Sequence, residues 1–518
     1  MILPSRRWSP RLCAFAAVTL FLALVARFWH PVYGLTELIQ LDASNDDLKI
    51  AAFRAHPVYV HRDTGGYDGL YYAQIAYDPL LTSPELPRAV DNLPYRARRI
   101  LVPALAWLLA AGRAGAIVHV YALLNPAAWL LLAALLWRLL AVADLRGWLA
   151  WAGVLFSAGA LGSVRLALTD LPMLALLTAA LGAAERARTR PAVAWLAAAA
   201  LARETALLGA AGLLTRPWGS RRNFLVCAGV AAPLALWLAY LRWRVAPDAA
   251  GWGNFTLPLA GWVEKGETVI LDLGFDPASP FAWTTLLATL GLTVQAGFIL
   301  TRWRRFNEAW WRVGAAYAGL MLLLGPAVWE GHPGAATRAL LPLTLAFNVL
   351  AHRTRAILAW LVLGNLGVFA GFLLIGDAHS HPREIFAGHS GGLASVVRLD
   401  TGWYNTERTG RHVWAWSPGR ARLDFETWTG APVTVRFAFA LRSLAPRIVV
   451  VRQDGRELWR GPVGEHLAEV AIPLRLGAGH VRLELTTDAP ASPEAPGAGS
   501  RQLAFALYDP HLEAAQPQ

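Results

Sequence analysis

Lysine and cysteine are almost absent from this chain of 518 residues. Lys49 and Lys265 are the only lysines, so the net charge of +12 comes almost entirely from arginine. The two cysteines, Cys13 and Cys227, lie in apolar runs and indicate neither a disulfide framework nor a zinc site. The sequence contains no P-loop and no dinucleotide-binding glycine pattern. These absences argue against a disulfide-rich domain, a P-loop protein and a Rossmann-type dinucleotide enzyme.

Apolar residues, in contrast, are abundant and occur in blocks. The chain is 56% hydrophobic and only 16% charged, with a mean hydropathy of +0.39. Such blocks indicate membrane spans, and 24 Trp and 12 Tyr suit many side chains at the bilayer surface. The basic charge fits either a nucleic-acid partner or arginines in loops that flank spans. We favour loop arginines and expect the lipid bilayer, and no nucleic acid, as a partner.

The first apolar run, residues 12–26, predicts a helix that anchors the chain in the membrane. Basic residues before a first span hold that end in the cytoplasm, and three arginines precede this run. A cleaved signal peptide is the alternative, but no small-x-small site follows the run, so we expect an uncleaved anchor. Residues 30–99 are then the first extracytoplasmic loop of a multi-pass protein of the bacterial inner (cytoplasmic) membrane.

Further apolar runs predict about 11 crossings in all. Residues 100–111 are too few for a span of about 20 residues and predict an interfacial or re-entrant helix. Residues 192–214 carry Arg203 and Glu204 at their middle and predict two half-depth helices that meet near this pair. The other spans are expected at 116–137, 148–162, 171–184, 224–241, 280–300, 313–329, 339–351 and 357–375, with residues 242–279 as an outer loop.

The arginine clusters agree with this topology. Each cluster between spans falls on the cytoplasmic side, as the positive-inside rule requires. The clusters lie at 6–11, 138–146, 186–190, 216–222, 302–312 and 353–355. The same topology places Asp68, Asp170, the Arg203-Glu204 pair and residues 330–338 together on the outer side.

The composition changes after residue 376. Short runs at 398–511 alternate apolar and polar positions between Gly/Asp turns, which predicts an antiparallel β-sandwich or jelly roll. We therefore expect a polytopic α-helical membrane domain at 1–376, a linker at 377–397 and a periplasmic sandwich at 398–518. Trp414 and Trp416 suit stacking on sugar rings, but their spacing also suits one buried face of a strand, which we favour.

The stretch 65–76, just after the first span, carries the main candidate for chemistry, Asp68. Tyr67 and Tyr72 are interfacial residues, and Gly69 allows a ligand to approach the backbone closely. A carboxylate at the start of a helix expected at 68–76 also suits a plain N-terminal cap. A catalytic carboxylate, a capping residue and a solvated loop charge remain open at this point.

The pattern Tyr67-Asp68-Gly69-x-x-Tyr72 resembles the polytopic glycosyltransferases of the C superfamily (GT-C), particularly the bacterial and mannosyltransferase-like branches. In those enzymes an Asp-Gly-x-x-Tyr segment precedes an Arg/Pro-rich helix, which corresponds here to residues 95–103. The Thr169-Asp170-x-Pro172 turn, the Arg203-Glu204 pair and the segment Arg338-x-Leu340-Leu341-Pro342 are also similar to elements of the family. The resemblance covers residues 10–376.

The resemblance implies an inverting glycosyltransferase of hexosyltransferase type. Its donor would be a polyprenyl-phosphate-linked sugar and its acceptor a glycan, lipid or protein of the cell envelope. The acid in the first loop, Asp68, would activate the acceptor hydroxyl. This sequence has Asp-Gly where many relatives carry two adjacent acids, so a divalent metal is possible but not implied.

The chemistry of the residues agrees with the resemblance. Glycosyl transfer from a lipid phosphate needs a base for the acceptor proton, for which Asp68 is available, and positive charge on the departing phosphate. Guanidinium groups can donate two hydrogen bonds to phosphate, and the outer-side candidates are Arg96, Arg98, Arg99, Arg203 and Arg338. Further substrate contacts are expected from Tyr67, Tyr72, Tyr95, Asp170, Glu204, Glu330 and His332.

Each of these residues also has a structural interpretation. The arginines at 96–99 suit interfacial anchors, Asp170 suits a helix cap, and an Arg203–Glu204 ion pair suits the interior of a membrane domain. Glu330 and His332 suit an ordinary mobile loop. Three residues of the expected linker, Asp377, His379 and His381, are either a metal site or, as we favour, solvated.

Two other classes of function remain open. A transporter or flippase for a lipid-linked glycan would need an inverted repeat and a charged path to both faces of the membrane, and the sequence shows no such repeat. A non-catalytic assembly protein of the cell envelope would present the sandwich and would not need Asp68.

Overall fold

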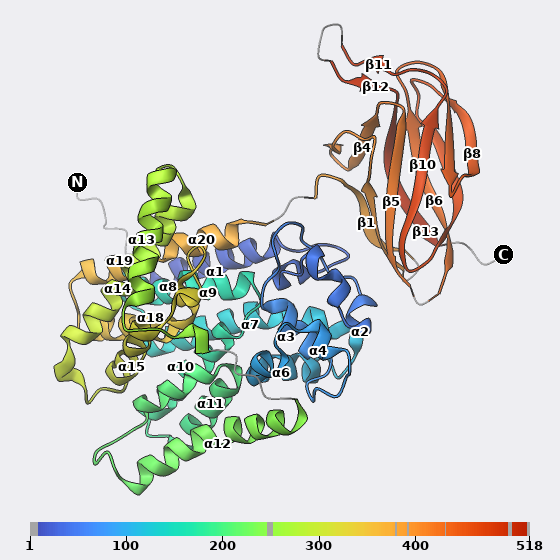
Figure 1. Cartoon of the computed structure of the whole chain (residues 1–518). Coiled ribbons are helices and arrows are strands. Elements are labelled where there is room, and N and C mark those ends of the chain that lie inside the picture. The colour runs from blue at the N-terminus through green and yellow to red at the C-terminus, as the bar shows by residue number, and fades with distance from the viewer. Residues whose placement is uncertain are drawn as a thin grey trace, which may run out of the picture. The chain divides into compact units, whose positions relative to one another are not determined.

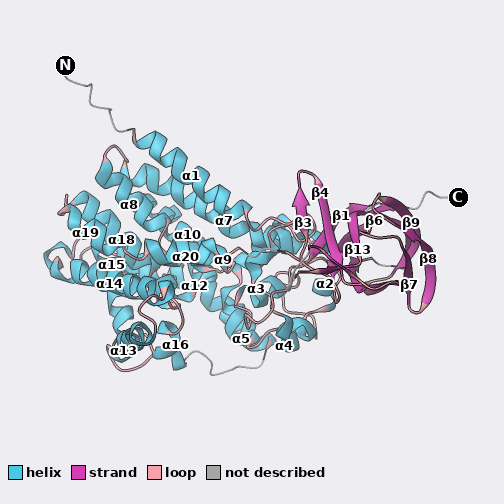
Figure 2. Ribbon diagram, turned by 90° about the horizontal axis from the view of Figure 1, so that it is seen from above, coloured by secondary structure: helices cyan, strands magenta, loops and turns pink. Residues whose placement is uncertain are grey.

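A computed structural model describes residues 9–245, 252–378, 381–390, 393–429, 431–495 and 500–514. The chain forms two compact units (Figure 1). The first comprises Met1–Trp29, Leu35–Phe53 and Tyr59–Ala378 and is helical; the second comprises His30–Gly34, Arg54–Val58 and His379–Gln518 and is built on β-strands (Figure 2). The second unit therefore takes two short segments from the first loop.

The helical unit consists of long apolar helices and several shorter ones. Among the described residues, five helical stretches are long and apolar enough to cross a membrane: α7 (Ala114–Leu140), α8 with α9 (Leu145–Arg165), α12 (Arg221–Arg244), α14 (Pro280–Thr301) and α19 with α20 (Leu358–Gly376). The other long helices are α1 (Pro10–Ala26), α10 (Asp170–Glu185), α11 (Thr189–Ala202), α15 (Ala309–Leu323) and α18 (Leu341–Arg353). These have 13 to 17 residues, fewer than the 20 or so of a typical span.

Short elements connect these helices. The first loop contains η1 (Thr36–Ile39), η2 (Ala43–Leu48), α2 (Ala51–Arg54), α3 (Gly69–Ile75), α4 (Leu86–Ala89), α5 (Leu93–Arg96) and η3 (Ala97–Arg99). Its first part is held by Asp42, whose buried carboxylate accepts backbone N–H bonds from Ser44 at 3.0 Å and Thr64 at 2.9 Å. The N–H group of Ser44 is the main cause of a pKa of Asp42 well below its ordinary value.

The short apolar run after the first loop forms α6 (Leu101–Leu109). Nine residues at 1.5 Å each extend only about 14 Å, so this helix is too short to cross a bilayer. The predicted outer loop at 242–279 is not wholly irregular, because it contains η5 (Trp252–Asn254) and α13 (Ala260–Phe275). Toward the C-terminal end of the unit lie η6 (Trp303–Arg305), α16 (Pro326–Trp329) and α17 (Ala336–Ala339).

The chain reverses direction at Arg203, which confirms the expected break near the Arg203-Glu204 pair. α11 ends at Ala202, Arg203 has an extended backbone (φ −157°, ψ 127°), and a 3₁₀ helix, η4 (Glu204–Gly212), follows. A Cβ on Gly209 would lie 2.9 Å from the side chain of Leu196, so η4 returns alongside α11. The absence of a side chain at Gly209 allows η4 to pack closely on α11. The two helices thus form a hairpin with Arg203 and Glu204 at its tip.

Several arginine clusters meet at the other end of the bundle. Arg353 pairs with Glu185 (Nη2–Oε2 2.9 Å), and Trp310 donates to the same carboxylate at 2.7 Å. Arg312 donates to the carbonyl oxygen of Leu214 at 2.9 Å. These contacts join the clusters at 302–312 and 353–355 to residues directly before the clusters at 186–190 and 216–222. They lie at the opposite end of α10 and α11 from Asp170 and Arg203.

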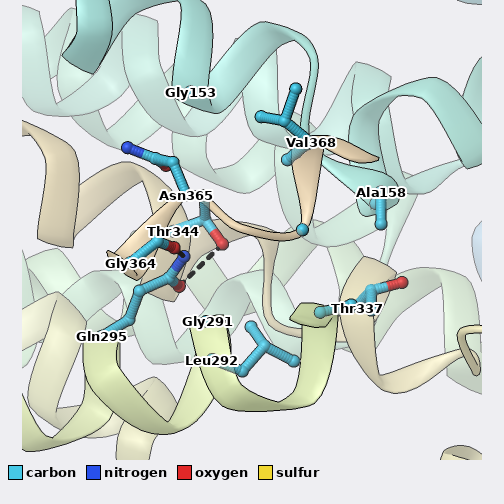
Figure 3. Close-up of a pocket in the computed structure, with 14 residues that line it drawn as sticks. Gly153, Ala158, Gly291, Leu292, Gln295, Thr337, Thr344, Gly364, Asn365 and Val368 are labelled. Carbon is cyan, nitrogen blue, oxygen red and sulfur yellow. Dashed lines mark hydrogen bonds between the residues drawn. The ribbon is translucent and has the colours of Figure 1, made fainter. Parts of the chain in front are cut away.

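Polar side chains also cross-link the middle of the bundle (Figure 3). Gln295 donates to the carbonyl oxygen of Gly364 at 2.6 Å and accepts from Thr344 at 2.9 Å. Asn348 and Asn365 exchange amide hydrogen bonds of 2.8 and 2.9 Å. The adjoining cavity, about 20 Å³, has room for about one water molecule. These bonds satisfy buried polar groups, and none of the residues belongs to the predicted site.

The second unit is an antiparallel β-sandwich. One sheet has the order β1-β2-β5-β10-β7-β8 and the other β3-β4-β13-β6-β9, with a small β11–β12 pair. The strands are β1 (Glu384–Ser390), β2 (Leu393–Leu399), β3 (Glu407–Thr409), β4 (His412–Ser417), β5 (Arg420–Trp428), β6 (Val433–Arg442), β7 (Arg447–Gln453), β8 (Arg456–Val463), β9 (Ala468–Leu476), β10 (Gly479–Thr487), β11 (Ser492–Pro493), β12 (Gln502–Leu503) and β13 (Phe505–Ala514). β1 and β2 lie in the range 377–397 that was expected to be a linker, up to Leu399.

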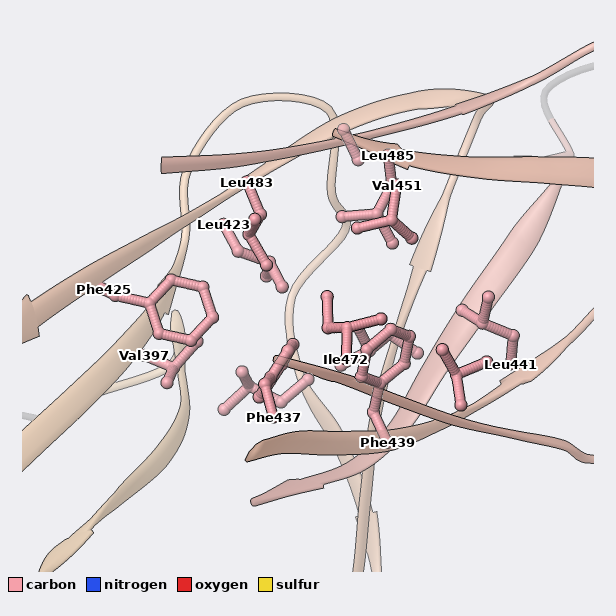
Figure 4. Packing of buried hydrophobic residues seen from close by; sticks show 14 of the residues in the cluster. Val397, Leu423, Phe425, Phe437, Phe439, Leu441, Val451, Ile472, Leu483 and Leu485 are labelled. Carbon is pink, nitrogen blue, oxygen red and sulfur yellow. The ribbon is translucent and has the colours of Figure 1, made fainter. Parts of the chain in front are cut away.

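Alternate residues of both sheets form the core of the sandwich (Figure 4). In β9, for example, Val470, Ile472 and Leu474 are buried while the residues between them are exposed. Trp416 is buried in a smaller cluster with Leu503 and Ala506, as the interpretation of the tryptophans as core residues predicts. Trp414 is half-buried and stacks on Tyr508 with ring centroids 5.4 Å apart.

The segment His30–Gly34 is part of the sandwich unit. His30 Nε2 lies 2.9 Å from Glu384 Oε2, and the phenol of Tyr33 donates to Glu426 at 3.1 Å. Arg398 contacts both Tyr33 and Glu426. Burial raises the pKa of Glu384. The hydrogen bond to His30 and the nearby cations lower this pKa by a larger amount, so the net shift is downward.

Candidate active site

Asp68 directly precedes α3 but does not cap it. Its backbone is helical and its side chain makes no capping hydrogen bond. Instead, its carboxylate Oδ2 lies 2.7 Å from Nη1 of Arg96, with 27% of the side chain exposed. Arg96 also binds Asp91, through bonds of 3.0 and 2.8 Å. Asp68 is therefore an oriented carboxylate that solvent or a ligand can reach.

Close packing at Gly69 holds Asp68 in place. A Cβ at Gly69 would lie 2.3 Å from the carbonyl oxygen of Leu166 and 2.9 Å from that of Ile39. The glycine thus lets the start of α3 lie against the end of α9 (Ala158–Arg165). Sequence reasoning connected Gly69 with a ligand, but the group that approaches its backbone is Leu166.

Arg99 is the centre of a second, buried group. It binds Glu204 through two bonds of 3.1 Å and also donates to the phenols of Tyr72 at 2.7 Å and Tyr95 at 3.1 Å. Burial raises the pKa of Tyr72 despite the nearby Arg99, so the phenol stays protonated. Arg96, Arg98 and Arg99 all lie over the ring of Tyr95, 5.1 to 5.5 Å from its centroid.

Asp170 is the centre of a third group. Its carboxylate is buried and contacts Nη1 of Arg203, while Nη1 of Arg338 lies 3.7 Å away. Arg338 also donates to the phenol of Tyr67 and lies over its ring, 5.1 Å from the centroid. Asp170 is the first residue of α10, and Thr169, at the cap position, makes no side-chain cap bond.

The three groups form one cluster because neighbouring residues link them. Tyr67 precedes Asp68, and Arg203 precedes Glu204, yet Arg203 and Glu204 pair with partners from other segments and not with each other. Ten of the predicted residues therefore meet at one end of the helical unit: Tyr67, Asp68, Tyr72, Tyr95, Arg96, Arg99, Asp170, Arg203, Glu204 and Arg338. Arg98 lies beside them on Tyr95.

The cluster has donors that no protein group uses. Within the described part of the chain, Arg98 has no carboxylate within 4 Å, and the buried Nε of Arg203 and hydroxyl of Thr169 have no hydrogen-bond partner. The nearby hydroxyl of Thr205 is also buried and has no hydrogen-bond partner among the described residues. Buried polar atoms normally have partners, so these unpaired donors mark the cluster as unusual for a purely structural one.

A cavity of about 370 Å³ opens beside this cluster. Tyr67 and Arg338 line it, together with the loop 330–335, which brings in the predicted residues Glu330 and His332. Neither Glu330 nor His332 pairs with the charged cluster: His332 hydrogen-bonds to Thr285 at 3.1 Å and lies 3.9 Å from Asp272. The cavity thus connects the two parts of the predicted site.

Three contributors were not identified from the sequence. Asp91 shares Arg96 with Asp68, Asn254 donates to the phenol of Tyr95 at 3.2 Å, and Lys265 donates to the carbonyl oxygen of Gly331 at 2.5 Å. Lys265 is 5% exposed, and burial lowers its pKa. The sequence did contain a signal for this residue, because Lys265 is one of only two lysines in the chain.

The expected linker residues do not form a metal site in the described part of the chain. Its residues contain no group of three or more His, Cys, Asp or Glu side chains that could hold a metal ion. Asp377 accepts from Arg165 through its carbonyl oxygen at 3.3 Å, and His381 lies 3.6 Å from Glu384. His379 lies outside the described residues.

No protein-family model matches the chain, and no curated protein matches it. Among solved structures, arabinosyltransferase EmbB from Mycobacterium smegmatis aligns with 99% of this chain and 66% of its own, at 12% identity and a TM-score of 0.25. A mutant of the family 29 carbohydrate-binding module CBM29-2 aligns with 25% of this chain and 87% of its own, at 12% identity and a TM-score of 0.16. A second family 29 module aligns with 25% of this chain and 86% of its own, at 11% identity and a TM-score of 0.16.

Proposed function

We propose that the chain is a membrane glycosyltransferase that moves a sugar from a polyprenyl-phosphate donor to an acceptor glycan, lipid or protein outside the cytoplasm. The observation that carries this proposal is the position of Asp68. It is a reachable carboxylate at the edge of a cluster rich in guanidinium groups, and a cavity adjoins that cluster. A base and a phosphate site side by side are what transfer from a lipid phosphate needs.

In the proposed reaction, Asp68 takes the proton of the acceptor hydroxyl. The hydroxyl oxygen forms a bond to the anomeric carbon as the bond from that carbon to the phosphate oxygen breaks, which inverts the configuration. Arg96 holds the Asp68 carboxylate in place, since its Nη1 lies 2.7 Å from Oδ2. The lipid phosphate leaves with the bonding electrons and gains negative charge.

The arginines around Asp170 suit that departing phosphate. Arg203 and Arg338 already share one carboxylate, and Arg203 keeps a buried donor without a partner among the described residues. Charge-assisted bonds from such donors stabilise developing negative charge most strongly where water is scarce. Arg98, which has no carboxylate partner in the described chain, adds a further positive charge nearby.

The two ends of the helical unit support an orientation in the bacterial inner membrane. Arginine clusters meet at one end and the candidate site lies at the other, and by the positive-inside rule this supports a periplasmic site. The candidate groups gather at one end, whereas a transporter needs polar groups along a path to both ends. This arrangement favours transfer over transport.

The test compares Asp68→Asn with Asp91→Asn. Both variants remove one carboxylate from Arg96, but only Asp68 is the proposed base. Purified protein is supplied with radiolabelled polyprenyl-phosphate sugars and envelope acceptors, with and without a chelator. We expect transfer to fall about 10²–10⁴-fold in Asp68→Asn and much less in Asp91→Asn. Equal turnover by Asp68→Asn and wild type would remove Asp68 from its role.

A further inference from the structure

The sandwich unit has an open groove of its own, with a volume of about 940 Å³. It lies along β1 and the β3–β4 hairpin and also includes His30 and Pro31 of the first loop. Figure 2 shows the three strands. Ligand pockets typically measure about 300–1,000 Å³, so this groove is large enough for an extended ligand. The predicted transferase residues do not line it.

The carboxylates of the groove have partners within the sandwich unit. Glu384 contacts His30 at 2.9 Å and Arg398 at 3.4 Å. Asp509 binds His412 at 2.6 Å and accepts the backbone N–H of Val413 at 2.8 Å. These contacts hold both carboxylates in fixed positions along the lining.

The arginines of the groove have fewer contacts than its acids. Arg408 and Arg411 flank the β3–β4 turn, both are exposed, and neither forms an ion pair with any residue that the structure describes. Arg408 makes one long bond, 3.4 Å, to the carbonyl oxygen of Glu384. Two exposed guanidinium groups without ion pairs can each donate to a carboxylate of a ligand.

The groove also has apolar surface next to these charges. The ring of Phe386 is half-buried and lies over Gly388, where an added Cβ would come within 3.3 Å of it. Proline rings line the groove at positions 31, 382 and 510. Flat apolar groups beside guanidinium groups suit a chain of sugar rings that carry acidic substituents better than a single ion.

We propose that this groove binds an acidic oligosaccharide, with Arg408 and Arg411 in contact with its uronate carboxylates. An acidic glycan is then the acceptor class of the transferase, and in that respect the inference rests on the proposed function. Binding itself requires no turnover, so the two proposals can fail separately.

The test measures binding of labelled oligogalacturonate, with neutral maltohexaose as the comparison. The full chain is held in phosphatidylcholine nanodiscs. We expect the uronate oligomer to bind at least about tenfold more tightly than the neutral one, and Arg408→Gln/Arg411→Gln to lose about tenfold in affinity. A matched control, Arg475→Gln/Arg482→Gln, removes two exposed arginines of β9 and β10 outside the groove and should bind as wild type does.

Several results would overturn the proposal. They are the absence of uronate binding, equal affinity for both oligomers, and equal loss in the control double variant. Asp68→Asn should bind the uronate normally without turnover, so an inactive enzyme that still binds separates this proposal from that of transferase activity.

Discussion

The pair of Arg99 and Glu204 should be strongly coupled. Arg99 is 6% exposed and binds Glu204 through two bonds of 3.1 Å. Removal of one partner from a buried pair costs about 3–5 kcal/mol, because the other charge is left without compensation. The side chain of Glu204 is 30% exposed, so water can reach the pair and we expect Glu204→Gln to cost about 2–3 kcal/mol.

The double variant distinguishes this explanation from a loss of packing. In Glu204→Gln/Arg99→Met neither charge remains, so the cost should be no greater than that of the larger single change. The interaction energy in the double-mutant cycle should then be about 2 kcal/mol. The exposed pair Arg305–Glu308 is the control, since its side chains are 43% and 39% exposed. Glu308→Gln should cost less than about 0.5 kcal/mol.

The measurement is unfolding of the purified protein by SDS titration in mixed micelles, followed by helical circular dichroism. Additive costs of the two single variants would refute the coupling of Arg99 and Glu204. A cost for Glu308→Gln as large as that for Glu204→Gln would show that the assay reports general charge removal and not the buried pair.

Three further predictions concern other parts of the fold. Gly69→Ala should destabilise the helical unit by about 1–3 kcal/mol and reduce activity, because its Cβ would overlap the carbonyl oxygen of Leu166; the same micelle titration measures this, and Gly219→Ala, with open space around it, should be neutral. The lowered pKa of Asp42 stabilises the first loop above about pH 4, where an unfolded Asp is ionised, and this stabilisation is lost as the pH falls further. Hydrogen exchange of residues 36–64 measures the effect, and in Asp42→Asn it should depend less on acid pH. Trp416→Ala should cost the sandwich about 3–5 kcal/mol in thermal unfolding and Trp414→Ala less, because only Trp416 is fully buried; equal costs would contradict the assignment.

Patterns with a clear physical period were predictable from the sequence. Apolar blocks predicted helices, alternation predicted an antiparallel sandwich, and the charges in the middle of 192–214 predicted the break at Arg203. An ionised pair inside an apolar run is costly in lipid, so it had to lie where the chain turns or faces other protein groups.

Partner choice in the cluster could not be predicted. Adjacent charges suggested an Arg203–Glu204 pair, but adjacent side chains at an extended residue diverge, and each found a partner from a distant segment. The same limit explains why Asp91 and Asn254 were missed, since both contribute only through the tertiary fold. β1 and β2 were not predicted, and most of their residues were assigned to a linker at 377–397. The reason is that their alternation of apolar and polar residues is short and interrupted by glycines.

The hydrogen bonds of His30 and Tyr33 to the sandwich restrict the path of the chain through the bilayer. Residues 30–34 and the strands that hold them must share one aqueous compartment, so the intervening chain crosses the membrane an even number of times. Within the described residues of that interval, five helical stretches are long and apolar enough to cross a membrane, which is an odd number. If all five cross, an odd number of the shorter helices crosses as well, and the bilayer then has to accommodate helices shorter than its own thickness.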